Sequence, residues 1–311
     1  MCGINGILGE FSEGQLQSSI KNMNDRLEHR GPDAEGAYVD YGIALGHRRL
    51  SIIDLSDAGN QPFYSDDKRF VIVYNGELYN FMELKAQLGD YSFQTNTDTE
   101  VVLASFMKWG ADCLAKFNGM FAFAIWDKKN KELFLARDRI GVKPFYYFQK
   151  NGKFIFSSEI KAILKHNVSR VLDAEALNHY FRLSYIPHPL TIFKEIKKLP
   201  QGHFLILKNG KIQLEKYWEV SDWNNFSSRE EAKQKIRWIF EDSIKHQIIS
   251  DRPIGVFLSG GVDSNIILGV TRKFLPNITK TYSTGFEIDA NMDNKFNVDF
   301  NLARQTAKYY G

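Results

Sequence analysis

Short apolar stretches separated by polar turns fill the first half of the chain. Residues 2–8 alternate small and apolar side chains, which predicts a strand, and residues 71–74 form an apolar strand that runs into a polar turn at Asn75-Gly76-Glu77. Further strands are expected at residues 43–53, 117–126, 132–136 and 153–157, and helices at residues 18–29, 99–109 and 159–164. Strands in short succession with few helices predict an α+β domain of stacked antiparallel sheets flanked by helices.

The second half has a different pattern, in which helices alternate with strands. Ser228 and Glu231 form a predicted capping box at the start of a helix whose packing face carries Ile236, Phe240 and Ile244. After it we expect a strand at residues 253–258, a helix at 265–274, a strand at 279–283 and a helix at 302–309. This alternation predicts the beginning of an α/β domain with a parallel sheet, of which the sequence holds about two βα units.

The stretch between these halves carries little recognisable chemistry. It contains a predicted helix at residues 173–181 and two hairpin-like strands at 204–207 and 211–214 around Asn209-Gly210. The domain boundaries are set accordingly. We expect a first domain at residues 1–205, a connector at 206–227 and, at 228–311, the N-terminal part of a second domain that is truncated in this sequence.

Composition narrows the class of protein. Of 311 residues, 43% are hydrophobic, which is enough for two domains with cores of their own. The net charge is +3, from 40 basic and 37 acidic residues, so no strong field favours nucleic acid or an anionic membrane. Only Cys2 and Cys113 are present, which excludes a disulfide framework and suits a reducing cytoplasm. No run approaches the roughly 18 apolar residues of a spanning helix, so we expect a cytoplasmic enzyme.

The N-terminus holds a candidate nucleophile. Removal of Met1 would leave Cys2 with both a thiol and a free amine. The thiol, with a pKa of about 8.5, is mostly protonated at neutral pH, whereas an α-amine with a pKa of about 7.7 to 8.0 is partly neutral and can assist its deprotonation. Gly3 leaves the approach to the thiol open. From this dipeptide alone, an ordinary second residue is the stronger interpretation.

Three further features offer groups for a small charged substrate. The adjacent cations Arg48 and Arg49 lie in a predicted strand, where alternation sends one of them inward to meet an anion. Asn75 and Gly76 can offer a side-chain amide and a backbone N–H to one oxyanion, although a hairpin turn explains them equally well. Asp98 opens a predicted helix, where an acid is usually a cap but can instead pair with a substrate ammonium.

A glycine-rich turn, Ser259-Gly260-Gly261-Val262-Asp263-Ser264, joins a strand to a helix in the second half. Such a turn presents backbone N–H groups and the positive end of a helix dipole to an anion. It lacks the lysine of a Walker loop and the third glycine of a dinucleotide fingerprint. An incidental turn between strand and helix is the alternative.

Five ordered motifs resemble the N-terminal-nucleophile glutaminase domain of glutamine-hydrolysing asparagine synthetases. They are Cys2-Gly3-Ile4, Arg30-Gly31-Pro32-Asp33, Arg49-Leu50-Ser51-Ile52, Asn75-Gly76-Glu77, and Arg137-Asp138 with Lys143-Pro144. The resemblance implies that Cys2 is the nucleophile and that Asn75 and Gly76 form the oxyanion hole. The remaining glutamine contacts that it implies are Arg49 for the carboxylate, Glu77 and Asp98 for the α-amine, and the neighbouring Leu50, Ser51, Ile52 and Ile53.

The later turn resembles the pyrophosphate loop of enzymes that cleave ATP to AMP and pyrophosphate. That resemblance implies phosphate contacts from Ser259, Gly260, Gly261 and Ser264, a Mg²⁺ ligand in Asp263, and nucleotide contacts from Leu258 and Thr284. Glutamine, aspartate and ATP would then be the substrates, ammonia would pass internally to an aspartyl adenylate, and a homodimer stays open. Two alternatives stay open as well: a related amidotransferase for another carboxylate, such as a sugar acid of a surface polysaccharide, and a truncated binding or regulatory module.

Overall fold

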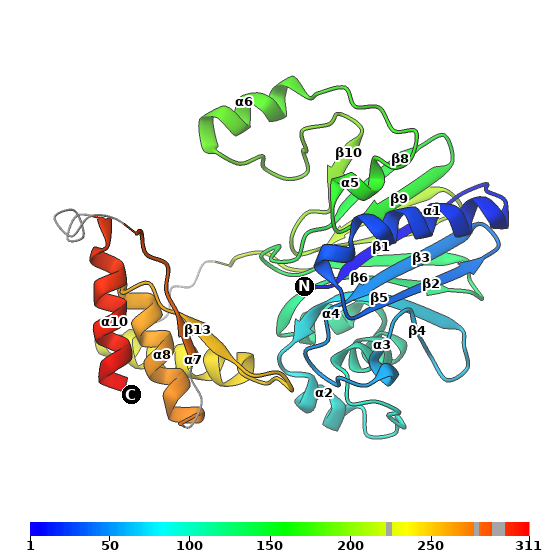
Figure 1. The fold of residues 1–311 in the computed structure, drawn as a ribbon. Helices are drawn as coiled ribbons and strands as arrows, with labels where there is room; N and C mark the ends of the chain where they lie inside the picture. Colours follow the sequence, from blue (N-terminus) through cyan, green and yellow to red (C-terminus); the bar gives the residue numbers. More distant parts are fainter. Residues whose placement is uncertain (222–225, 277–279, 288–295, 311) are drawn as a thin grey trace. The chain divides into compact units, whose positions relative to one another are not determined.

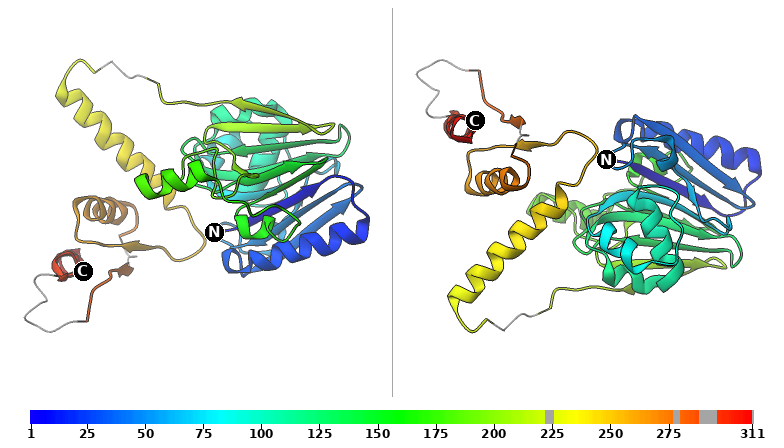
Figure 2. Two further views of the ribbon diagram at one scale, coloured as in Figure 1. Left: turned by 90° about the horizontal axis from the view of Figure 1, so that it is seen from above. Right: turned by 90° about the horizontal axis from the view of Figure 1, so that it is seen from below.

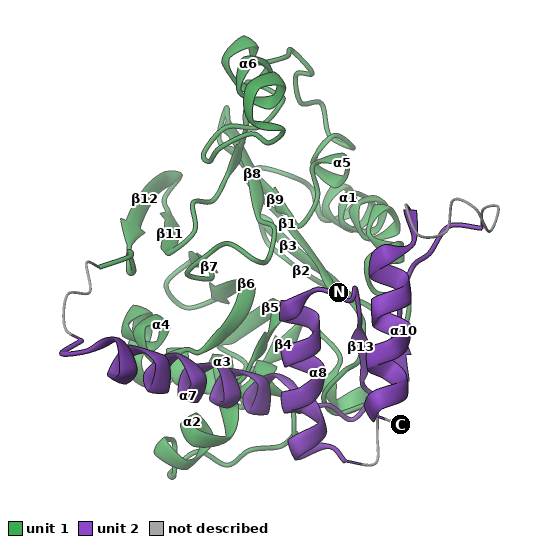
Figure 3. Ribbon diagram, turned by 90° about the vertical axis from the view of Figure 1, so that its left-hand side faces the viewer, with its two compact units in different colours: residues 1–221 green, residues 222–311 purple. Residues whose placement is uncertain are grey.

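The computed structural model describes residues 1–221, 226–276, 280–287 and 296–310. Contacts between residues divide the chain into two compact units, Met1–Ser221 and Asp222–Gly311 (Figure 3). Each unit is described by itself. Within the described residues, no helix has the length and apolar character needed to span a membrane.

Unit 1 is built on two six-stranded sheets whose paired strands are all antiparallel (Figure 1). The first sheet has the order β10-β8-β9-β1-β3-β2, and the second has the order β12-β11-β7-β6-β5-β4. The strands of the first are β1 (Gly3–Leu8), β2 (Ala34–Asp40), β3 (Ile43–Arg49), β8 (Tyr146–Lys150), β9 (Lys153–Ser157) and β10 (Ile196–Lys198). Those of the second are β4 (Phe63–Tyr64), β5 (Phe70–Leu78), β6 (Gly119–Asp127), β7 (Glu132–Arg137), β11 (His203–Lys208) and β12 (Lys211–Lys216).

Helices cover the outer faces of both sheets, as the further views in Figure 2 show. The first sheet packs on α1 (Glu13–Arg26) and α5 (Ile160–Ile163), and the second packs on α2 (Phe81–Gln87), α3 (Asp98–Trp109) and α4 (Cys113–Lys116). The remaining helices of unit 1 are α6 (Ala174–Leu183), η1 (Glu28–Arg30), η2 (Asp57–Gly59) and η3 (Gly110–Asp112). The predicted α+β arrangement of stacked antiparallel sheets flanked by helices is confirmed.

The two sheets bury a common apolar core between them. Ile4 and Leu45 from the first sheet meet Val71 and Val73 from the second in this core. Because side chains alternate along a strand, the residues that continue these rows also face the opposite sheet. The rows lead to Cys2, next to β1, and to Asn75 in β5, so the fold directs the candidate residues toward one another.

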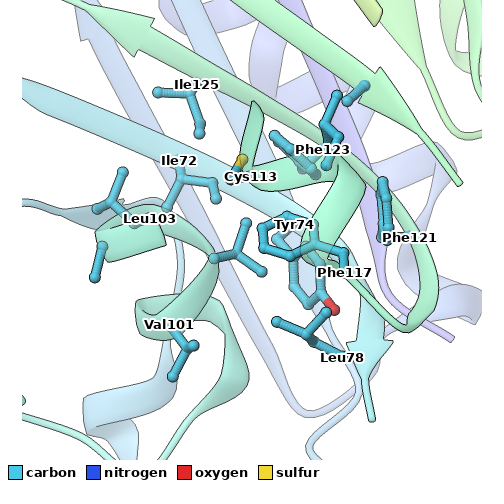
Figure 4. Close-up of a cluster of buried hydrophobic side chains, with 14 of the residues drawn as sticks. Ile72, Tyr74, Leu78, Val101, Leu103, Cys113, Phe117, Phe121, Phe123 and Ile125 are labelled. Carbon is cyan, nitrogen blue, oxygen red and sulfur yellow. The ribbon is translucent and has the colours of Figure 1, made fainter. Parts of the chain in front are cut away.

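A second core lies between β5, β6, β7 and the helices α3 and α4, and it accounts for the other cysteine. Cys113 is completely buried there, among side chains that include Tyr74 and Phe123 (Figure 4). Burial raises the pKa of the Cys113 thiol, so this cysteine acts as a small apolar residue.

Several local predictions differ from the structure. Strand β5 continues through Asn75-Gly76-Glu77, so the predicted turn there is wrong: the β6 residues Ala122, Phe121 and Met120 pair with this segment. Helix α1 begins at Glu13, before the predicted start at residue 18, because Ser12 and Gln15 form a capping box. Strands β2, β4, β8 and β10 were not predicted, since β4 and β10 are very short and the polar and aromatic residues of β2 and β8 lack clear alternation.

Residues 206–216, which we expected to open a connector, lie within the second sheet. β11 pairs with β7 as well as with β12, and the residues of β11 from Phe204 to Leu207 are mostly buried. The compact first unit therefore continues to Ser221.

Unit 2 contains a short parallel sheet. Its elements are α7 (Arg229–Gln247), β13 (Gly255–Phe257), α8 (Val262–Phe274), β14 (Lys280–Tyr282) and α10 (Val298–Tyr310). The parallel pairing of β13 with β14 confirms the predicted start of an α/β domain. Ser228 caps α7 as predicted, but Glu231 reaches back to Ser227 and not to Ser228. The predicted packing face of α7 is only partly covered in the described residues: α7 contacts α8, and Phe240 and Ile244 are half-buried, but Ile236 is exposed.

Candidate functional site

Cys2 lies at the end of β1, beside the end of β3. The register of these strands pairs Gly3 with Arg48, which brings Cys2 level with Arg49. The Leu50 N–H donates to Cys2 Sγ at 3.4 Å, and Arg30 Nε donates to the carbonyl of Cys2 at 2.9 Å. Burial raises the pKa of the Cys2 thiol, whereas the Leu50 bond and the nearby amino group lower it. The thiol therefore needs a nearby base.

Arg49 is the inward cation that the sequence predicted, with an exposed fraction of 5%. Its guanidinium donates to the carbonyl of Ser56 at 2.6 Å, to Asn60 Oδ1 at 2.9 Å and to the carbonyl of Asp54. Gly59 permits this close packing, because a Cβ there would lie 2.2 Å from Arg49 Nη2. Among the described residues, no carboxylate forms an ion pair with Arg49, so a positive charge is left for a ligand anion.

Two acids, Glu77 and Asp98, face this pocket. Among the described residues, neither of them forms an ion pair with a protein cation. Asp98 accepts hydrogen bonds from Tyr74 Oη at 2.9 Å and from the Leu78 N–H at 2.8 Å. Burial raises the pKa of Glu77, and the charge of Asp98 raises it further; burial also raises the pKa of Asp98, against the opposing effect of its hydrogen bonds. Two acids of this kind, the buried Asp98 and the half-buried Glu77, attract a cationic ligand.

Asp98 is not the helix cap that its position suggested. The N-cap of α3 is Thr97, whose side chain accepts a hydrogen bond from the Glu100 N–H at 3.3 Å. The carboxylate of Asp98 instead joins the start of α3 to β5 through Tyr74 and Leu78. The cap interpretation of Asp98 is therefore wrong.

Asn75 and Gly76 lie on β5 beside the same pocket. Asn75 is 1% exposed, and neither atom of its side-chain amide has a hydrogen-bond partner within the part of the chain that the structure describes. A buried amide without a partner is rare and costs roughly 1–3 kcal/mol. The arrangement suits an amide that is kept for a ligand oxygen.

The backbone of Gly76 points toward an uncovered edge of the sheet. β4 covers β5 only at Val71 and Ile72, and the Ser65 N–H donates to the carbonyl of Phe70 on this same edge. Along a strand, the backbone N–H and C=O groups of successive residues point to opposite sides. Those of Tyr74 and Gly76 therefore point to the same side of β5 as those of Phe70, but beyond the end of β4. The Gly76 N–H is thus placed to donate to a ligand.

One small cavity, ≈ 30 Å³, brings most of these residues together. The predicted residues that line it are Cys2, Arg49, Leu50, Ile52, Ile53, Gly76, Glu77 and Asp98. Ser51 does not line it: the Ser51 N–H donates to Asp33 Oδ2 at 2.8 Å and so joins two of the sequence motifs. Gln61, Tyr74, Thr97 and Thr99 also line the cavity and were not predicted, since nothing in their local sequence distinguishes them.

We expect Glu77→Gln to stabilise the protein at alkaline pH. Because the folded-state pKa of Glu77 is raised, the folded protein loses stability as the pH rises from about 4.5 through that pKa. The variant lacks this loss, so its Tm should exceed that of the parent by about 2 °C or more at pH 8, with no gain at pH 4.5. Thermal unfolding across this pH range measures the effect. The exposed Glu28→Gln serves as the control. Equal changes in Tm for both variants would refute the idea that ionised Glu77 destabilises the folded protein.

The glycine-rich turn of unit 2 is braced by its own side chains. Ser264 Oγ accepts from the Ser259 N–H at 3.2 Å and donates to the carbonyl of Gly261 at 3.0 Å. Gly260 has a φ of 78°, and a Cβ there would lie 2.3 Å from the carbonyl of Asp299. The turn therefore requires glycine at this position and leads directly into the N-terminus of α8.

The other predicted nucleotide residues border this turn. Leu258 is buried and pairs with Tyr282 of β14, whereas Asp263 in the first turn of α8 and Thr284 are exposed. No group of three or more His, Cys, Asp and Glu side chains in the described residues is arranged to hold a metal ion. A single carboxylate such as Asp263 suits Mg²⁺ only where substrate phosphates supply further ligands to the ion.

Two family profiles match the chain. The profile of the glutamine amidotransferase domain matches residues 1–218, and that of asparagine synthase matches residues 235–311. A solved Bacillus subtilis glutamine phosphoribosylpyrophosphate amidotransferase, complexed with ADP and GMP, is similar in fold. Its TM-score is 0.52 at 17% identity, with 93% of this chain and 67% of that chain covered.

Similar proteins are named as asparagine synthetases. A protein of Methanocaldococcus jannaschii, provisionally named glutamine-hydrolysing asparagine synthetase 2, is 42% identical over 92% of this chain and 60% of its own length. Glutamine-hydrolysing asparagine synthetase 1 of Bacillus subtilis is 37% identical over 92% of this chain and 46% of its own length. The chain thus spans about half the length of the curated relatives that it matches.

Proposed function

The chain belongs to the glutamine amidotransferase family, with an asparagine synthase domain beginning after that domain, and we propose that it serves glutamine-dependent asparagine synthesis. Unit 1 hydrolyses glutamine to glutamate and ammonia, and the ammonia is used to amidate aspartate at the expense of ATP. The observation that carries this proposal is the cavity beside Cys2, which is lined by one cation and two acids that have no partner of opposite charge in hydrogen-bond contact among the described residues.

The charges of the cavity match those of an α-amino acid. Arg49 binds the α-carboxylate of glutamine, and Glu77 and Asp98 bind its α-ammonium group. Binding at these two groups fixes the amino-acid end, so the side-chain amide extends toward Cys2. Asp98 is already held by Tyr74 and Leu78, which reduces the reorganisation that binding requires.

Hydrolysis then proceeds through a thioester. After removal of Met1, the α-amine of Cys2 takes the thiol proton while sulfur bonds to the amide carbon, and the carbonyl oxygen becomes an oxyanion. Asn75 Nδ2 and the Gly76 N–H donate to that oxyanion. The amine returns its proton to the departing nitrogen, ammonia leaves, and water cleaves the thioester to give glutamate and free Cys2. Burial already lowers the pKa of the N-terminal amino group at Met1, in the direction that suits a base.

We expect Asn75→Ala to slow glutamine hydrolysis without loss of stability. Removal of one oxyanion donor lowers kcat by about 10²- to 10³-fold, and KM should change little because the ground-state contacts remain. The Asn75 amide has no protein partner in the described residues, so the Tm should not fall. Steady-state kinetics and thermal unfolding test both parts.

Asn80→Ala is the matched control for Asn75→Ala. Asn80 Oδ1 accepts from the Asn118 N–H at 2.9 Å, and Asn80 Nδ2 donates to the carbonyl of Lys116 at 3.0 Å. This variant should lose stability and keep its kcat. If Asn75→Ala behaves in the same way, Asn75 is structural.

In unit 2, the turn at residues 259–264 binds the phosphates of ATP through its backbone N–H groups, Ser259 and Ser264. Leu258 and Thr284 border the nucleotide. Asp263 holds Mg²⁺ together with the phosphates, and the ion neutralises phosphate charge when bound. Ser259 is exposed and Ser264 is half-buried, and their hydroxyl oxygens lie 3.1 Å apart in the turn.

We expect Asp263→Asn to weaken binding of Mg²⁺–ATP by about tenfold, because a single charged ligand is lost while the exposed side chain leaves folding unchanged. Isothermal titration calorimetry of the full chain measures the affinity. Glu230→Gln, an exposed change on α7, should leave it unaltered. Equal affinity of the Asp263→Asn variant and the parent would exclude Asp263 as a metal ligand.

Several properties remain predictions. The acceptor is proposed to be aspartate, with another carboxylate as the alternative, and a homodimer and a cytoplasmic location are proposed with it. The start of the second domain at residue 228 is also a prediction. Glutamine hydrolysis by the purified chain separates an active glutaminase from a module that only binds or regulates.

A further inference from the structure

A histidine that the hydrolytic steps do not use joins the two sheets beside the cavity. His47 lies in β3, paired with Ile4 of β1, and it is completely buried. Its Nε2 lies 3.1 Å from the carbonyl oxygen of Tyr74 in β5. The contact therefore connects the sheet that carries Cys2 to the strand that carries Asn75 and Gly76.

The chemistry of this contact defines the tautomer of His47. A carbonyl oxygen only accepts hydrogen bonds, so Nε2 carries the proton and donates it. Burial lowers the pKa of His47 to about 3, and the imidazole is therefore neutral. Nδ1 then holds a lone pair, and it has no partner among the described residues.

Tyr74 is held at three points around the site. Beyond the end of β4 its backbone has no strand partner on that edge within the described part of the chain, and side chains take the place of a strand. His47 donates to its carbonyl, and Gln61 Oε1 accepts from its N–H at 2.6 Å. Its hydroxyl donates to Asp98 at 2.9 Å. The peptide bond that His47 holds is the one that leads directly into Asn75.

We propose that His47 is a positioning residue, which sets the distance between the nucleophile and the oxyanion donors by fixing the Tyr74–Asn75 peptide to the sheet that carries Cys2. This inference rests on the proposed glutaminase activity. His47 does not touch the reacting atoms. Its loss lets the Asn75-Gly76 segment shift relative to Cys2, and small displacements of catalytic groups cost rate more than they cost binding.

Two substitutions distinguish the ring nitrogens. In His47→Gln the terminal amide nitrogen takes the place of Nε2 and keeps a donor toward Tyr74. In His47→Asn the amide nitrogen takes the place of Nδ1 and does not reach the carbonyl oxygen of Tyr74. We expect kcat for glutamine hydrolysis to fall about tenfold or more in His47→Asn and to stay within about threefold in His47→Gln, with KM nearly unchanged in both.

The measurements separate this inference from the proposed function. The wild-type rate tests glutamine hydrolysis by itself, and the ratio of kcat between the two variants tests the position of the donor. Tm values of both variants show whether a loss of rate follows a loss of stability. A loss of kcat in His47→Asn beyond any difference in Tm supports the positioning role, and equal kcat in the two variants, or a change confined to KM, overturns it.

A readout without substrate tests the hydrogen bond directly. The ¹⁵N chemical shifts of the His47 ring, assigned by comparison with the His47→Gln variant, report which nitrogen is protonated. Protonation at Nε2 supports the contact with Tyr74. Protonation at Nδ1 alone overturns it, whatever the enzymatic activity of the chain.

Discussion

Cys2→Ala is expected to abolish glutamine hydrolysis, with a fall in kcat on the order of 10⁴-fold or more. The variant has no thiol to form the thioester, and the remaining donors cannot replace a nucleophile. The oxyanion donors and the charged groups of the cavity remain, so glutamine should still bind. Release of glutamate and ammonia measures the loss of rate, and calorimetry with glutamine measures the binding.

Cys113→Ala is the matched control, since it removes the other cysteine. Cys113 is buried in the core between β5, β6 and the helices (Figure 4), and its side chain does not line the cavity. We expect this variant to lose some stability and to retain its kcat. Residual hydrolysis by Cys2→Ala close to the wild-type rate, or loss of kcat in Cys113→Ala alone, would exclude Cys2 as the nucleophile.

The state of the N-terminus decides which group acts as the base. The proposed mechanism uses the α-amine of Cys2, which is free only after Met1 has been removed. Intact-mass analysis of the active enzyme measures this directly. Full activity in a preparation that retains Met1 would leave Cys2 as nucleophile and remove its amine from the mechanism.

The sequence predicted the strands well where apolar residues follow one another without interruption, as in β6, β7 and β9. It failed at β5, where Asn75-Gly76 has the composition of a turn but is held in an extended conformation by pairing with β6. That pairing involves residues more than 40 positions away, so a local pattern cannot reveal it. The continuation of the strand matters for function, because it directs Asn75 and Glu77 between the sheets.

The site was predictable where ordered motifs carry its residues, as for Cys2, Arg49 and Glu77. The supporting residues were not. Gln61 and His47 act through the backbone of Tyr74, and both contacts arise because β4 is too short to cover that part of β5. The length of a neighbouring strand is a property of the folded sheet, so neither residue has a signal of its own in the sequence.

Asp98→Asn is expected to lower kcat/KM for glutamine by about 30-fold or more, because loss of one partner of a buried charged contact costs roughly 2–5 kcal/mol. The substitution keeps the size of the side chain and removes the charge that meets the substrate ammonium. Ser12→Ala removes the cap of α1, a helix that does not line the cavity, and should lower stability by about 1 kcal/mol, with little change in kcat/KM.

A second substrate shows whether Asp98→Asn loses activity because the ammonium contact is lost or because the structure of the site is disturbed. An analogue of glutamine without its α-amino group makes no contact with the charge of Asp98. Wild-type enzyme should therefore prefer glutamine strongly over the analogue, and Asp98→Asn should lose most of that preference by losing rate on glutamine alone. If both substrates slow by the same factor, Asp98 supports the site only through its hydrogen bonds to Tyr74 and Leu78, and Glu77 is left to bind the ammonium.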